Sequence, residues 1–199
     1  MMHGLPDASI PFDLPDAPGV PGLILKAGSS GAADVRHVAS ASVLRIDGRS
    51  AFRDAVRHAL AEAAHAGQRE LWCCDETFAD WPLNDAEVIA SLVRWARPQR
   101  RLTLIARRYD DLAVRHPRWV AWRRIWSHVV VCRAAEPTQR TDLPTLLCAP
   151  PHCTLRLADR VHHLGTLSAD IHDAVRAHEQ IDAISQRSFE TFGATTLGL

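Results

Sequence analysis

The chain has 199 residues, of which 47% are hydrophobic and 23% charged, and its formal net charge is zero. This length and composition predict one ordinary globular domain with a tail. No run approaches the roughly eighteen consecutive apolar residues of a membrane span, and the N-terminus lacks a basic start and an apolar signal segment. We therefore expect no membrane span and a cytoplasmic location.

The charge is unevenly distributed along the chain. The segment from Arg94 to Arg133 holds eleven arginines and two aspartates, a net charge of +9. Residues 75–87 hold five acids and no base. This pattern predicts an electrically polarised molecule.

The cysteine pattern favours reduced, buried thiols over disulfides or metal ligands. There are five cysteines, an odd number, and no pair has C-x-x-C spacing. Cys148, His152 and Cys153 could together bind zinc, but they lack the usual ligand spacing. The acids of the loop at 75–80 match no calcium pattern, which favours a solvated loop. We expect no metal and no cofactor.

Proline and glycine divide the chain into two parts. Prolines recur every three to five residues between Pro6 and Pro21, which defeats both helix and sheet pairing. We predict a flexible Pro/Gly-rich N-terminal arm over residues 1–40, followed by one domain over residues 41–199.

Hydrophobic periodicity then predicts alternating strands and helices. Strands are expected at 42–46, 70–74, 101–106, 128–132 and 145–148, followed by a hairpin from residue 152. Helices are expected from 47–50 to about Gly67 and at 84–97, 110–115, 117–127 and 169–192. The last helix would bury Ile171, Ala174, Val175, Ile181, Ile184 and Phe189. This order predicts an α/β fold with a mainly parallel or mixed sheet flanked by helices.

The densest group of polar residues lies in the predicted hairpin. His152 is followed by a hydroxyl residue, Thr154, and by Asp159 seven positions after the histidine; Gly165-Thr166 comes next. We predict a strand, a tight turn at Asp159-Arg160, and a second strand before the last helix.

This register resembles the H-x-K-x-x-x-x-D motif of the phospholipase D superfamily, which is followed by Gly-Ser or Gly-Asn. The resemblance covers about residues 42–193 and implies a phospholipase D-like domain of the bacterial, single-motif type. In that family the histidine attacks phosphorus, and the lysine neutralises charge on the phosphate oxygens. Here Thr154 replaces the lysine and a second motif is absent. Because this catalysis is largely electrostatic, the resemblance implies a degenerate, non-catalytic member.

Two other interpretations of this stretch stay open, one catalytic and one purely structural. Arg156 should face the same side of the strand as Thr154, so it could partly replace the lysine in a phosphodiesterase with an H-x-T-x4-D site. In the blandest interpretation, the same residues merely form a strand and a turn. The candidate ligand-binding residues are His152, Thr154, Arg156, Asp159, His163, Gly165 and Thr166.

The predicted helix at 117–127 suggests a further alternative. Trp119, Trp122 and Trp126 share one helical face. The nucleic-acid candidates Arg115, Arg118, Arg123 and Arg124 lie elsewhere on the cylinder, where they could contact phosphates. We favour the simpler interpretation, a buried tryptophan face with a solvated arginine face.

The first hypothesis is therefore a non-catalytic binding or regulatory module. Its partner would be a phosphate-bearing ligand or a protein, and it could form a homodimer. The sequence does not identify the partner.

Overall fold

The structure is a computed structural model that describes residues 43–136, 143–151 and 153–193. The chain divides into two units, Met1–Val38 and Ala39–Leu199, and the described residues all belong to the second. The predicted flexible arm and His152 lie outside the described residues.

The described elements follow the predicted alternation up to the last helix. The strands are β1 (Val43–Asp47), β2 (Glu70–Asp75), β3 (Arg101–Ala106), β4 (Val130–Ala135), β5 (Leu146–Ala149), β6 (Cys153–Asp159), β7 (Leu164–Ser168) and β8 (Ser188–Glu190). The helices are α1 (Gly48–His65), α2 (Ala86–Trp95), α3 (Asp110–Arg115), α4 (Pro117–Ile125) and α5 (Ile171–Gln186). None of these helices is long and apolar enough to cross a membrane.

Local chemistry explains where several of these helices begin and end. Gly67, just beyond α1, has a φ of +68°, a conformation that glycine adopts without steric cost. Pro98 follows α2 and cannot continue it, whereas Pro117 occupies the first turn of α4. The Asp170 carboxylate accepts the backbone N–H groups of His172 and Asp173 and so caps α5.

The strands form one mixed sheet in the order β1-β7-β6-β5-β2-β3-β4-β8. The β2–β3 and β3–β4 pairs are parallel, and the other pairs are antiparallel. Following the pairings, β1, β6, β2, β3 and β4 run in one direction and β7, β5 and β8 in the other. The predicted α/β class is confirmed, with a mixed sheet in which two of the seven strand pairs are parallel.

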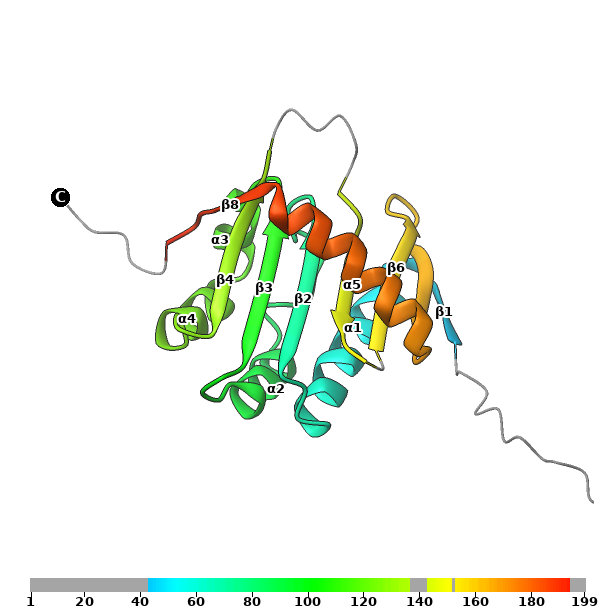
Figure 1. Cartoon of the computed structure of the whole chain (residues 1–199), viewed down its shortest axis with the longest axis horizontal. Coiled ribbons are helices and arrows are strands. Elements are labelled where there is room, and N and C mark those ends of the chain that lie inside the picture. Colours follow the sequence, from blue (N-terminus) through cyan, green and yellow to red (C-terminus); the bar gives the residue numbers. More distant parts are fainter. Residues whose placement is uncertain (1–42, 137–142, 152, 194–199) are drawn as a thin grey trace, which may run out of the picture. The chain divides into compact units, whose positions relative to one another are not determined.

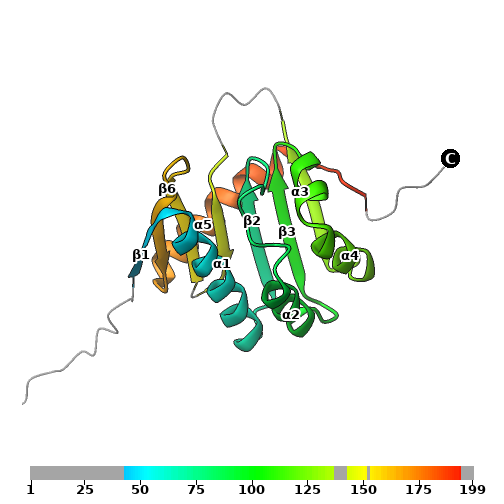
Figure 2. The ribbon, with the colours of Figure 1, turned by 180° about the vertical axis from the view of Figure 1, so that it is seen from behind.

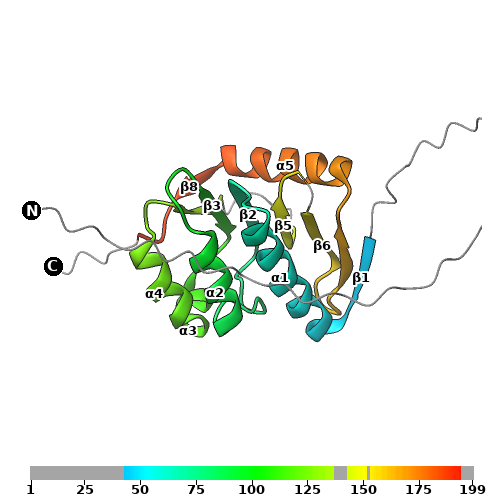
Figure 3. The same cartoon turned by 90° about the horizontal axis from the view of Figure 1, so that it is seen from below.

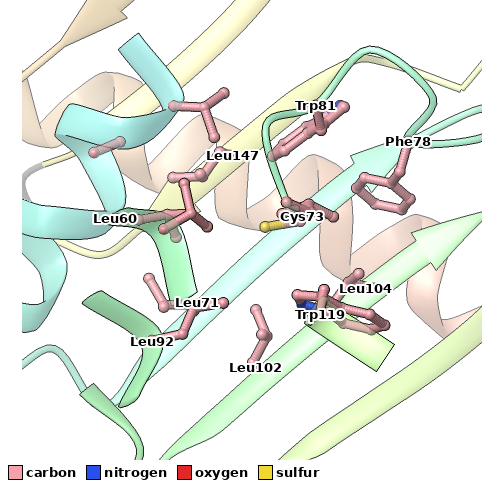
Figure 4. Close-up of a cluster of buried hydrophobic side chains, with 14 of the residues drawn as sticks. Leu60, Leu71, Cys73, Phe78, Trp81, Leu92, Leu102, Leu104, Trp119 and Leu147 are labelled. Carbon is pink, nitrogen blue, oxygen red and sulfur yellow. The ribbon is translucent and has the colours of Figure 1, made fainter. Parts of the chain in front are cut away.

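Helices cover both faces of the sheet. Helix α5 crosses one face (Figure 1), and the other four helices lie on the opposite face (Figures 2 and 3). The larger core lies between the sheet and α1, α2 and α4, and it contains Trp81, Trp95 and Trp119. Figure 4 shows its centre, where Leu60 and Leu92 pack on strand residues. A smaller core under α5 includes Cys74, Ile105 and Cys148.

The end of the chain differs from the prediction. Helix α5 ends at Gln186, and residues 188–190 form β8, which pairs antiparallel with β4. The Arg133 guanidinium donates to both the Oγ and the carbonyl oxygen of Ser188, which fixes the chain along the edge of β4. Phe189, predicted to be buried, is therefore exposed, as are Ile171 and Val175. The buried stripe of α5 is Ala174, Ala177, Ile181 and Ile184.

The hairpin connection is also longer than predicted. The tight Asp159-Arg160 turn is wrong, because β6 ends at Asp159 and β7 begins only at Leu164. The β6–β7 register shifts between Leu157 and Asp159, which is a bulge in the ladder. The bulge and the longer turn redirect the end of the hairpin.

Candidate functional site

The described motif residues are divided between the two ends of the β6–β7 hairpin. His152 lies outside the described residues, and Thr154 is the second residue of β6. Thr154 is only 4% exposed and pairs in register with Cys148, whose thiol donates to the Ala174 carbonyl of α5. The position that would hold the motif lysine is therefore packed beneath α5.

The Thr154 hydroxyl lacks a well-placed hydrogen-bond partner among the described residues. Its Oγ1 is buried and has no hydrogen-bond partner of ordinary geometry among the described residues. Burial raises the pKa of the Cys148 thiol to about 11, and the neighbouring Thr154 hydroxyl offsets only part of that rise. The charge of Arg156, on the same strand face, also offsets part of the rise in the pKa of Cys148.

Arg156 lies on the same face as Thr154, as predicted, but its guanidinium is directed elsewhere. Its Nη1 donates to Gln180 Oε1 on α5 at 2.7 Å, on the exposed side of the helix. Its cross-strand partner is Thr166, which is also exposed. Arg156 and Thr166 thus form a polar pair beside α5, separate from the buried Thr154 hydroxyl.

Gly165 has a packing role in this hairpin. A Cβ atom placed on it would lie 2.1 Å from the Arg156 carbonyl oxygen and 2.9 Å from the Leu157 Cα. No real Cβ contact is that short, so β7 approaches β6 here because residue 165 has no side chain.

Asp159 and His163 lie at the other end of the hairpin. Asp159 Oδ1 accepts the backbone N–H groups of Val161 and His162, and its Oδ2 lies 2.7 Å from His162 Nδ1. These interactions, the His162 side chain first, lower the pKa of Asp159. His163 Nε2 lies 3.4 Å from Asp80 Oδ2, and its ring packs against Phe52.

A cleft of about 680 Å³ joins this hairpin end to the loop that follows β2. It lies at the C-terminal ends of β2 and β6, the edge of an open α/β sheet where ligands usually bind. Its polar lining includes Asp75, Asp80, Asp159, Arg160 and His163, and its apolar lining includes Phe52, Trp81, Leu157 and Val161. We define these nine residues as the cleft.

Asp75 fastens the cleft loop to the sheet. It is 8% exposed; its Oδ1 accepts the backbone N–H groups of Thr77 and Phe78, and its Oδ2 accepts the Thr145 hydroxyl at 2.6 Å. Glu76 accepts the Leu143 N–H. The prediction of a solvated loop is wrong for Asp75, because its carboxylate is buried and accepts hydrogen bonds from donors within the protein.

The cleft is bordered by two strained backbone positions. Phe78 and His163 have φ values of +60° and +54°, which residues other than glycine rarely adopt. Each costs about 1 kcal/mol or more and persists only where the surroundings impose it. At Phe78 the carbonyl oxygen accepts a hydrogen bond from His116 Nε2 at 2.9 Å.

The His116 contact predicts a pH-dependent stability. Burial lowers the pKa of His116, and no described residue accepts a hydrogen bond from its buried Nδ1. Unfolded His116 takes up a proton near pH 6.5, whereas the folded residue resists it, so the stability from neutral His116 is lost as pH falls below about 6.5. In urea unfolding at pH 7.5 and 5.5, we expect the stability advantage of the wild type over His116→Gln to shrink at the lower pH.

The exposed His128 supplies the control for this experiment. His128→Gln should keep the pH dependence of the wild type. An unchanged difference between the wild type and His116→Gln at the two pH values would contradict the assignment.

Comparison with known proteins identifies the architecture. No protein-family model matches the sequence, and no curated protein matches it significantly. Among solved structures, the phospholipase D family member Nuc from Salmonella typhimurium superposes with a TM-score of 0.53 at 8% identity, covering 77% of this chain and 100% of Nuc. This domain has a phospholipase D-like fold.

Two further structures show the same fold. NucT from Helicobacter pylori superposes with a TM-score of 0.50 at 7% identity, covering 76% of this chain and 100% of that one. TrmBL2, an archaeal chromatin protein, superposes with a TM-score of 0.54 at 15% identity; 79% of this chain matches 56% of TrmBL2. The chain thus spans about half the length of TrmBL2.

The predicted arginine and tryptophan platform is not one surface of this phospholipase D-like domain. Trp119 and Trp122 are buried, which confirms the core interpretation for both. Arg123 is only 6% exposed and lies 5.0 Å from the centroid of the Phe192 ring. A nucleic acid therefore cannot contact Arg123 in this fold.

The other nucleic-acid candidates lie at the surface. Arg118 bonds Asn84 through its backbone N–H and its Nη1, and Arg115 lies 3.8 Å from Asp111. Arg124 is exposed on the last turn of α4. These three arginines belong to the solvated side of α3 and α4.

The considered zinc trio is not supported by the placement of its thiols. Cys148 packs in the core under α5, whereas Cys153 packs against the core on the opposite face of the sheet. Cys73, Cys74, Cys132 and Cys148 are buried free thiols, as predicted.

Proposed function

We propose that this phospholipase D-like domain is non-catalytic and acts as a binding or regulatory module for a phosphate-bearing ligand or a protein partner. The observation that carries the proposal is the state of Thr154, the residue at the motif lysine position. Thr154 is uncharged and buried beneath α5, so it offers no cation to a developing phosphate charge. Arg156, the alternative cation, donates to Gln180 at an exposed position.

The contacts of the cleft carboxylates favour a binding role for this domain over a catalytic one. The Asp75 oxygens accept buried donors, the Asp159 oxygens accept groups of their own turn, and Asp80 pairs with Arg49 at 2.6 Å. The carboxylates therefore hold the cleft in shape and are not poised as an acid and base pair. Asp80 and Asp159 stay partly exposed, 45% and 39%, and could accept hydrogen bonds from a partner.

The fold itself is compatible with such a role. TrmBL2 is described as a chromatin protein with a novel mode of DNA binding, and Nuc as a phospholipase D family member. At 8–15% identity these likenesses extend to the fold alone. The homodimer and the cytoplasmic location remain predictions.

The test is turnover of a generic phosphodiester, bis(p-nitrophenyl) phosphate, by the purified full chain. We expect the wild type to release no more nitrophenol than His152→Ala, because the motif lacks its cation. Arg156→Ala should behave in the same way. Robust turnover that disappears in His152→Ala would contradict the proposal, and turnover that also requires Arg156 would support the phosphodiesterase alternative.

A further inference from the structure

The topology gathers arginines at the edge of the sheet opposite the cleft. Because β2, β3 and β4 are parallel, their starts lie at one edge, together with the ends of α1 and α2 (Figure 1, lower edge). Five arginines lie in or beside the loops there: Arg69, Arg94, Arg97, Arg100 and Arg101. We define these five residues as the basic edge.

Hydrogen bonds hold the basic edge together. The Arg101 N–H donates to the Arg69 carbonyl at 2.9 Å, and the Arg100 N–H donates to the Arg97 carbonyl at 3.2 Å. The Arg100 guanidinium lies over the Trp95 ring, 5.8 Å from its centroid, and donates to the Trp95 carbonyl. The arginines of both loops are thus connected through the backbone.

The positive charge of the basic edge is not neutralised within the described part of the chain. None of the five guanidinium groups has a described carboxylate within ion-pairing distance. Arg94 donates to Ser91 Oγ, and Arg97 donates to the Ala96 and Val93 carbonyls. The Arg97 contacts satisfy carbonyls at the C-terminal end of α2. Each guanidinium carries five N–H donors, so most of the donors remain available.

The two edges of the sheet differ in how far their charges are paired. At the cleft edge the acids are paired: Asp80 with Arg49, and Glu76 with Arg107 and Arg160. The basic edge has Glu70 at the start of β2, but its five guanidinium groups lack such partners among the described residues. A polyanion approaching the domain would be attracted more strongly to the unpaired arginines of the basic edge than to the paired charges of the cleft edge. This orientation follows from the parallel strands and does not depend on the sequence of the polyanion.

We propose that the basic edge binds the phosphate backbone of double-stranded nucleic acid, without reading its base sequence. The proposal rests on the proposed non-catalytic function and names its phosphate-bearing partner. Arginine presents a planar fork that matches phosphate oxygens bidentately. Trp95 is fully buried, and Trp126, in the connection to β4 at the same edge, packs partly against the core. The edge therefore offers little ring surface for stacking single-stranded bases.

The composition of the edge favours nucleic acid over an anionic membrane. The residues between the arginines include Gln68, Glu70, Pro98 and Gln99, which are not the large apolar anchors of membrane-surface helices. Contacts with phosphates alone make binding strongly dependent on salt. With three to five phosphates neutralised, affinity should fall about 40- to 500-fold between 50 and 200 mM salt, at a slope of about −0.9 per phosphate.

The test measures binding of the full chain to a labelled 20-base-pair DNA duplex, by fluorescence anisotropy, across that salt range. The variant Arg69→Gln, Arg97→Gln, Arg101→Gln should bind at least tenfold more weakly at 50 mM salt, with a shallower slope. The matched control Arg108→Gln, Arg115→Gln, Arg118→Gln removes three exposed charges that follow β3 or lie on α3 and the first turn of α4, and it should bind within about twofold of the wild type. Single variants Arg69→Gln and Arg101→Gln should each reduce the slope by about one phosphate, which keeps the test valid if the triple variant unfolds.

Several results would overturn the proposal. They are a flat salt dependence, no binding at 50 mM salt, an equal loss in the control, or binding to phosphatidylserine vesicles through these arginines with none to the duplex. Cleavage of the duplex is a different failure, because it would contradict the non-catalytic function and leave the location of the binding surface standing.

Discussion

Gly165→Ala is expected to lower the free energy of unfolding by about 3 kcal/mol, near the upper end of the usual cost of overpacking. The added methyl group would lie 2.1 Å from the Arg156 carbonyl oxygen, which belongs to the backbone and cannot rotate away. Relief therefore requires β7 to move from β6, next to the bulge between Leu157 and Asp159. Urea unfolding of the variant and the wild type measures the loss.

The neighbouring residue provides the control. Thr166 lies on the same strand and is exposed, so Thr166→Ala should change the stability by less than about 0.5 kcal/mol. A Gly165→Ala protein as stable as the Thr166→Ala protein would contradict the packing role. In that case a ligand-binding role would be the better explanation for Gly165.

Thr154→Lys, which restores the lysine of the phospholipase D motif, is expected to destabilise the domain by about 3 kcal/mol or more. The ammonium group would enter a site that is 4% exposed, beneath α5 and on the same face as Arg156. Burying a charge is costly, and the like charge of Arg156 adds to the cost. The carboxylate beside the site, Asp173, already accepts the hydroxyl of Ser168, the cross-strand partner of Thr154, and pairs with Arg176. Urea unfolding and a circular dichroism spectrum would report the loss.

Thr154→Val is the matched control for this change. Valine has nearly the same shape and removes a hydroxyl that lacks a well-placed partner, so we expect a change within about 1 kcal/mol. A stable Thr154→Lys protein that gains affinity for inorganic phosphate would show that the site still accepts the family's cation. That result would argue against a degenerate motif.

Local patterns predicted the elements well, whereas their partners depended on the whole fold. The order of strands and helices up to β6 follows from periodicity, proline and glycine. β8 was missed because the edge of β4 pairs with residues 188–190, and nothing local distinguishes them from the end of a helix. The strained residues Phe78 and His163 gave no signal either, because glycine is the usual mark of a positive φ.

The motif was a better guide to the fold than to a site. A strand rises about 3.3 Å per residue, so Thr154 and Asp159, five residues apart on β6, are separated by roughly 17 Å. The spacing by itself therefore argues against both side chains lining one small pocket. The cleft uses Asp159 and His163 but combines them with Asp75 and Asp80, which are about 80 residues away along the chain.

The position of the arginine surface, like that of the cleft, becomes visible only once the strand topology is known. The excess of arginines between Arg94 and Arg133 was visible in the sequence. The helix at 117–127 offers candidate nucleic-acid contacts in the sequence, but one of them, Arg123, is buried. The parallel strands instead bring Arg69 beside Arg97, Arg100 and Arg101, a contact between loops that no local pattern predicts.

The central claim is that this domain binds a phosphate backbone without breaking it. The most direct measurement incubates an end-labelled DNA duplex with the full chain at 50 mM salt and then analyses it on a native and a denaturing gel. The claim predicts a shifted complex on the native gel and full-length strands on the denaturing gel. Shortened strands that disappear with His152→Ala would contradict it.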